Sequence, residues 1–145
     1  NNDIQVDPAH IKLMHKAMTS VVNDPDGTAF GSRFNLNGVA SAGKTGTVQV
    51  RRISKDERES GIIPNEELDW HLRDHALFVG FAPVKNPKYS VAVVVEHGGS
   101  GSKVAAPIAQ KLLKMALERD RQPLKIKTAS AAKFNKTKKN TAGTA

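Results

Sequence analysis

Hydrophobic residues recur along the chain with two different periods, which divide the sequence into helices and strands. Between residues 11 and 21, apolar side chains stand three and four positions apart, and this predicts an amphipathic helix over residues 7–22. Asp7 is suited to cap its first turn. A second stripe of the same period predicts a helix over residues 103–119.

Three other segments are predicted to be strands, the first from its polar–apolar alternation and the third from its β-branched content. They cover residues 45–52, 75–82 and 89–96. The turn between the second and third strands, residues 83–88, is too short for a helical crossover, so these two strands must be antiparallel. Antiparallel strands covered by helices predict an α+β fold.

A long excursion over residues 53–73 separates the first two strands and is expected to be a loop that lines a functional site. His71 and His75 stand four apart and could share a metal on a helix, but no third ligand lies near them, so no metal site is predicted. His97, after the third strand, is expected to order a loop rather than to catalyse. The nearby arginines are expected to be solvated: Arg51, Arg52 and Arg58.

The net charge of +8 is concentrated at one end of the chain. Residues 122–145 hold six lysines and no acid, which leaves 16 basic and 14 acidic side chains in residues 1–121. We therefore predict a folded part over residues 1–121 and a disordered basic tail over residues 122–145. A non-enzymatic binding module, whose tail recruits nucleic acid or anionic lipid, is one hypothesis for this chain.

Several absences narrow the choice of protein class. The chain has no cysteine, which excludes disulfides and cysteine-based zinc sites. Its longest nearly continuous apolar run, residues 91–95, is too short to span a bilayer. Because the sequence starts at Asn1, with neither a Met nor a signal-like segment, we expect it to be a piece of a longer protein.

One short stretch supports two incompatible chemistries. Residues 38–45 match the phosphate-binding pattern G-x-x-x-x-G-K-T, whereas residues 44–47 read K-T-G-T, the third motif of penicillin-binding enzymes. A phosphate loop requires a helix to start at the Lys-Thr pair, here over residues 45–53. Gly46 and the β-branched residues after it instead favour a strand, which disfavours a nucleotide-binding enzyme.

Four blocks of sequence, taken in order, resemble the C-terminal part of the transpeptidase domain of class B penicillin-binding proteins, and most closely the elongation-type members. The resemblance covers about residues 5–118, with Val48 where the family often has Ala. The blocks are GKTGTVQV (43–50), DHALFVGFAP (74–83), NPKYSVAVVVEHGGSG (86–101) and AAPIAQ (105–110).

The resemblance implies acyl transfer through a serine nucleophile, with no cofactor, on the D-Ala-D-Ala end of peptidoglycan stem peptides or on β-lactams. It implies that Lys44 supplies a positive charge, that the hydroxyls of Thr45 and Thr47 bind the terminal carboxylate, and that the Thr47 N–H forms half of the oxyanion hole. Gly46 suits a position where a side chain would obstruct a substrate along the strand edge.

The nucleophile is expected to lie outside this chain. No S-x-N or Y-x-N occurs, and the S-x-x-K pattern occurs at three places that fit a nucleophile poorly, namely Ser41, Ser100 and Ser130. The fragment alone should therefore be inactive and should need the missing N-terminal part of the same protein. By resemblance, the full protein acts with cell-wall elongation partners at the periplasmic face of the cytoplasmic membrane, and no nucleic-acid partner is expected.

Overall fold

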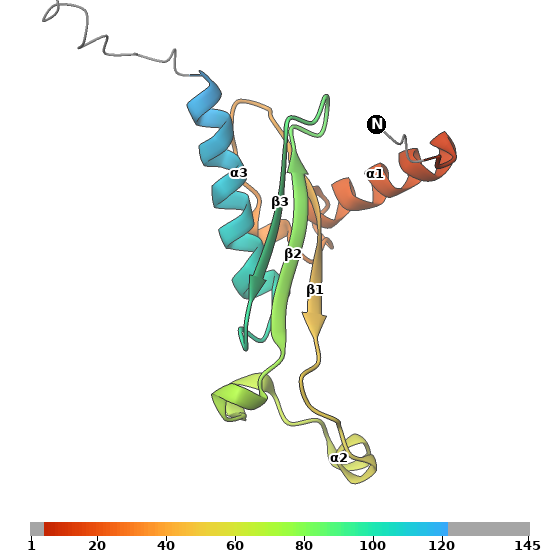
Figure 1. The fold of residues 1–145 in the computed structure, drawn as a ribbon, viewed down its shortest axis with the longest axis vertical. Helices are drawn as coiled ribbons and strands as arrows, with labels where there is room; N and C mark the ends of the chain where they lie inside the picture. The colour runs from red at the N-terminus through yellow and green to blue at the C-terminus, as the bar shows by residue number, and fades with distance from the viewer. Residues whose placement is uncertain (1–4, 122–145) are drawn as a thin grey trace, which may run out of the picture.

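The computed structural model describes residues 5–121, which form three helices and a three-stranded sheet among shorter helical turns (Figure 1). The predicted disorder of the tail concerns residues outside this range. The main elements are α1 (Pro8–Asn23), β1 (Ala42–Val48), α2 (Lys55–Ser60), β2 (His75–Ala82), β3 (Tyr89–Val95) and α3 (Ala106–Arg121).

The sheet is antiparallel throughout, with the strand order β1-β2-β3. Phe78 at the middle of β2 stands opposite Thr45 of β1 and Val93 of β3. With helices beside such a sheet, the predicted α+β class is confirmed. β2 covers the predicted range of residues 75–82, and β3 ends one residue earlier than expected.

The core lies between the sheet and α3. Phe78 and Ala76 of β2 are completely buried together with Ala109 of α3. The ring of Phe78 lies over two glycines of the sheet. Gly43 and Gly80 make room for this ring, because a Cβ at either position would overlap its edge. Glycine inside a strand often marks such a close approach, so these two residues serve packing.

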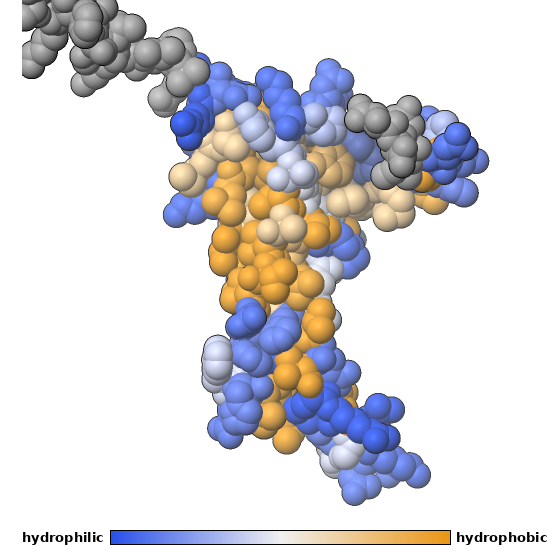
Figure 2. Space-filling view, viewed as in Figure 1, coloured by the Kyte–Doolittle hydropathy of each residue, from blue (hydrophilic) through white to orange (hydrophobic). Residues whose placement is uncertain are grey.

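In the described part of the chain the opposite face of the sheet is apolar and mostly uncovered, except at Phe81, whose ring centroid lies 5.2 Å from that of His15 in α1. Val79 and Val94 are 46% and 61% exposed there, and Val48 is 46% exposed. Figure 2 shows this apolar surface over the middle of the molecule. Helix α1 extends away from the sheet (Figure 1), and Met14 on its apolar stripe is also more than half exposed.

The bounds of the first strand differ from the sequence prediction of residues 45–52. β1 begins at Ala42, which α1 helps to bury, and ends at Val48, which stands opposite His75, the first residue of β2. Beyond this point β2 offers no partner, and the Val50 N–H instead donates to the Asp74 side chain at 3.4 Å. The strand therefore stops where its partner begins, although its alternation continues.

The excursion predicted as a loop over residues 53–73 contains regular structure. Ser54 caps α2 by accepting a hydrogen bond from the Glu57 N–H at 3.1 Å, and two 3₁₀ turns follow at Asn65–Glu67 and Trp70–Leu72. We call residues 49–74 the arm. In Figure 1 it projects beyond the end of the sheet that lies opposite the β2–β3 turn.

The last helix also begins differently from the predicted range of residues 103–119. A π-helical turn at Gly101–Ala105 precedes α3, and Ser100 caps this turn by accepting a hydrogen bond from the Lys103 N–H at 3.3 Å. Gly101 is buried where this turn meets the sheet. This turn places Gly101 against the backbone of Gly46 and Leu77 before the chain becomes α-helical.

Candidate functional site: the edge of the first strand

β1 pairs with β2 on one side only, so in residues 5–121 its other edge has no strand partner. The predicted site residues 44–47 lie in the middle of this strand. An edge strand presents backbone N–H and C=O groups that an extended ligand can bind. The structure therefore brings the four predicted residues together on an accessible edge.

The phosphate-loop hypothesis is wrong. It requires a helix over residues 45–53, but Lys44 and Thr45 lie inside β1, and the next α-helix starts only at Lys55. No helix N-terminus is available at this lysine to cradle a phosphate. The eight-residue match to the nucleotide-binding pattern has no structural basis here.

The side chains of the motif divide between the two faces of the sheet. Because successive residues of a strand point to opposite faces, Thr45 and Thr47 share the face of the buried Phe78, whereas Lys44 lies on the other face with Val79. A ligand that contacts the lysine and both threonines must lie along the edge of the strand. A ligand resting on either face alone would miss one set.

Two polar contacts order the start of this edge. The exposed Lys44 donates from Nζ to the Thr45 carbonyl at 2.6 Å, and the Oγ1 atoms of Thr45 and Thr28 are 3.0 Å apart. Thr28 belongs to the segment that follows α1. The helix before the sheet thus contributes indirectly to the placement of the Thr45 hydroxyl.

The backbone of Gly46 is supported by the turn before α3. A Cβ on Gly101 would overlap the Gly46 carbonyl oxygen and would come within 2.6 Å of the Leu77 carbonyl oxygen. Gly101 therefore lies directly against the peptide groups of β1 and β2. Sequence reasoning missed this glycine, since only the folded chain brings it to the strand.

Two serines of the S-x-x-K pattern lie in the described part of the chain, Ser41 and Ser100, and both have structural roles. Ser41 is 2% exposed, and its hydroxyl donates to Gln110 Oε1 at 2.6 Å. Ser100 caps the π-helical turn, and Lys103 pairs at 3.8 Å with Glu66. Ser130 lies outside the described residues.

The histidines at the arm end of the sheet form an aromatic cluster. His75 Nδ1 accepts a hydrogen bond from the His97 N–H at 2.9 Å, and the His97 ring lies 4.4 Å from the ring of Trp70. His71 is in a 3₁₀ turn rather than on a helix with His75, so their spacing of four does not place them on one face. Within residues 5–121, no group of three metal-binding side chains occurs.

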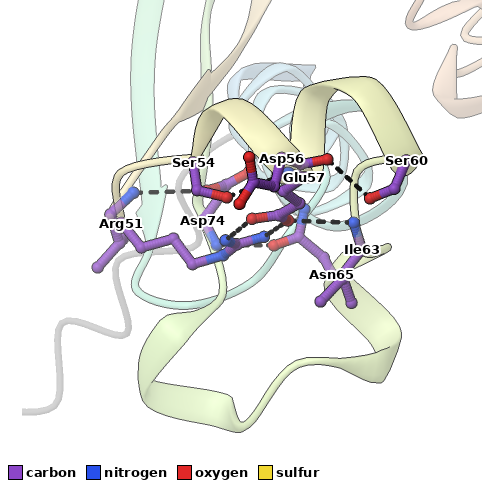
Figure 3. Close-up of polar contacts among 9 residues, drawn as sticks. Arg51, Ser54, Asp56, Glu57, Ser60, Ile63, Asn65 and Asp74 are labelled. Atoms are coloured by element: carbon purple, nitrogen blue, oxygen red, sulfur yellow. Dashed lines mark hydrogen bonds and ion pairs between the residues drawn. The ribbon is translucent and has the colours of Figure 1, made fainter.

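An ion pair inside the arm was missed in the sequence, where Arg51 was expected to be solvated (Figure 3). Arg51 instead donates to both carboxylate oxygens of Glu57, with the Nη1–Oε2 distance at 2.7 Å, and the two side chains are 18% and 13% exposed. Glu57 also accepts from the Ile63 N–H at 3.2 Å. The hydrogen bonds from Arg51 lower the pKa of Glu57 from 4.5 to about 2.

This lowered pKa predicts that the arm loosens in acid. A carboxylate whose pKa is depressed in the folded state contributes stability above its unfolded pKa, and this is lost as the pH falls from about 4.5 to about 2. Hydrogen exchange of residues 49–74 should accelerate across this range, after correction for the intrinsic rates. Glu57→Gln should show fast exchange already at neutral pH, and an arm equally protected at both ends of the range would contradict the prediction.

Comparison with known proteins then defines the class. Residues 1–114 match the family model described as the penicillin binding protein transpeptidase domain. The chain therefore belongs to this family.

Within the family, the chain is similar to the peptidoglycan D,D-transpeptidase MrdA of Salmonella typhimurium, with 36% identity over 101 residues, which cover 70% of this chain. The chain spans only 15% of that relative's length. It is also similar to solved structures of penicillin-binding protein 2. These relatives confirm the resemblance drawn from the four sequence blocks.

Two such structures give the details. Pseudomonas aeruginosa PBP2 in complex with WCK 5153 has a TM-score of 0.58 and 36% identity, covering 88% of this chain and 23% of that one. The complex of PBP2 and MreC from Helicobacter pylori has a TM-score of 0.56 and 26% identity, covering 81% of this chain and 20% of that one.

Proposed function

We propose that this chain is the C-terminal part of the transpeptidase domain of a peptidoglycan D,D-transpeptidase, and that it supplies the substrate-binding edge of the active site. The observation that carries the proposal is the K-T-G-T sequence of residues 44–47 on the exposed edge of β1, in a chain that belongs to the penicillin-binding family.

Each residue of the motif has a role in this proposal. Lys44 provides the positive charge that favours the substrate carboxylate and proton transfer near the nucleophile. The hydroxyls of Thr45 and Thr47 bind the terminal carboxylate of a D-Ala-D-Ala stem peptide or of a β-lactam. The Thr47 N–H donates to the oxyanion that forms when the serine attacks the carbonyl carbon. Gly46 leaves the edge free of a side chain.

The serine nucleophile comes from the missing N-terminal part of the same protein. That part has a second task, because the apolar sheet face that includes Val79 and Val94 needs a cover. Covering this face would bring the nucleophile toward Lys44, which lies on the same side of the sheet as Val79. The fragment alone should therefore be inactive and prone to associate through this face.

The relatives support a proposal for the setting of the whole protein. The Helicobacter pylori relative was solved in complex with MreC, and we propose a comparable cell-wall elongation partner for this protein. Its site of action would be the periplasmic face of the cytoplasmic membrane, where peptidoglycan is assembled. In residues 5–121, no helix combines the length and the hydrophobicity that a membrane span needs.

The test is to acylate the natural full-length protein with a penicillin and to map the modified residue by mass spectrometry. We expect one adduct, on a serine upstream of Asn1. An adduct on Ser100, or no adduct in a folded protein, would contradict the proposal. The non-enzymatic alternative, a binding module that acts through its basic tail, predicts instead a steeply salt-dependent binding that is lost when residues 122–145 are deleted.

A further inference from the structure

Asp74 bonds to three other parts of the chain at the point where β1 leaves the sheet, and Figure 3 shows its contact with Asn65. Its Oδ1 accepts from the Val50 N–H at 3.4 Å, and its Oδ2 accepts from Asn65 Nδ2 at 3.1 Å. Its own N–H donates to Asn65 Oδ1 at 2.8 Å, and its carbonyl accepts from the Gly99 N–H at 2.8 Å. The Asn65 amide thus donates to the Asp74 carboxylate and accepts from the Asp74 backbone N–H, so both ends of the amide are bound by one residue.

These contacts constrain both supports of the proposed substrate strand. Val50 follows Thr47 by three residues, so the long, exposed bond to Asp74 links the exit of β1 to the residue before β2. Gly99 precedes Gly101 by two residues, and Gly101 lies against the peptide of Gly46. A displacement of Asp74 would therefore alter the backbone after Thr47 and also the position of Gly101, which contacts Gly46.

The chemistry of the pair suits this task. Asp74 and Asn65 are both partly buried, and a carboxylate that accepts from an amide makes a stronger bond than two neutral groups do. The arm, which contains Asn65, is itself held by the ion pair of Arg51 and Glu57. The arm is therefore an ordered support for the edge of β1, tied to it through Asp74.

We infer that Asp74 and Asn65 are positioning residues for acyl transfer, which hold the exit of β1 and the turn before Gly101 in the geometry that the motif needs. The inference rests on the proposed transpeptidase function. Neither residue belongs to the motif, and both act through β1. A displacement of about 1 Å in a substrate-positioning group costs on the order of a hundredfold in rate.

The experiment exchanges the two groups in the natural full-length protein and measures the second-order rate constant of acylation by a fluorescent penicillin. Asn65→Asp places two carboxylates face to face and removes the amide donor, so acylation should slow by about ten- to a hundredfold. The double variant Asn65→Asp/Asp74→Asn restores an amide opposite a carboxylate. Its rate constant should return to within about threefold of the wild-type value.

Asn35→Asp is the matched control, since it makes the same chemical change at an exposed residue whose neighbours Phe34 and Leu36 pack near Ala82, at the other end of β2. It should acylate like the wild type, and the melting temperature of each variant shows whether it is folded in the assay. Full acylation of Asn65→Asp, or a double variant as slow as the single one, would overturn the inference. A folded wild-type protein that is not acylated would instead refute the proposed function, and the inference with it.

Discussion

Lys44→Ala in the full-length protein is expected to slow penicillin acylation by about a hundred- to a thousandfold, the range found when one electrostatic stabiliser is removed from an acyl-transfer site. Lys44 is exposed on the edge strand, and its Nζ bonds only to the neighbouring Thr45 carbonyl in the described structure. Its removal should therefore change the free energy of unfolding by less than about 0.5 kcal/mol. The second-order acylation rate constant is the measurement.

Lys55→Ala provides the comparison for this variant. Lys55 is an exposed lysine of α2 whose Nζ lies 3.9 Å from Oε1 of the exposed Glu59, and such surface pairs contribute little. Its loss should leave acylation unchanged. If Lys44→Ala and Lys55→Ala were acylated at the same rate, the lysine of the motif would have no role in the chemistry.

Gly101→Ala is expected to impair both folding and acylation. The new Cβ would overlap the Gly46 carbonyl oxygen and lie 3.0 Å from the Gly46 nitrogen, so the turn and β1 would have to separate. Overpacking of this kind typically costs about 1–3 kcal/mol, and here both opposing groups are backbone, which cannot rotate away. Thermal unfolding should show a clear decrease in melting temperature, and residual acylation should be slow even where the protein is folded.

Gly31→Ala tests whether this cost comes from the contact with the strand. A Cβ at Gly31 would meet no atom within 4 Å, so the same substitution should be nearly neutral there. If alanine were as well tolerated at position 101 as at position 31, the turn before α3 would not be in tight steric contact with β1.

Local patterns predicted the types of the main elements because the forces behind them are local. Asp7 accepts the hydrogen bond of the Ala9 N–H at 2.8 Å, as expected of a helix cap, and the β-branched run of β3 forms a strand. The end of β1 could not be predicted in this way. It depends on where β2 begins, and that is a property of the pairing rather than of either segment.

The same limit applies to the site. The motif at residues 44–47 is visible in the sequence, and its roles in binding remain predictions. The residues that support the motif could not be identified from the sequence, because Gly101 and Asp74 reach β1 only after folding. Arg51 was expected to be solvated for a similar reason. Its partner Glu57 lies six residues away, across a turn that the alternating pattern did not predict.

The close contact between Gly101 and Gly46 has a consequence for recognition. β2 holds one side of β1 and the turn before α3 supports it from below, so the strand is preorganised before any ligand arrives. A ligand that lies along the free edge then loses little affinity to ordering the protein backbone. If the edge binds substrate as proposed, it should select by shape: an extended backbone or a rigid ring that matches its spacing should bind, and compounds that require the strand to bend should not.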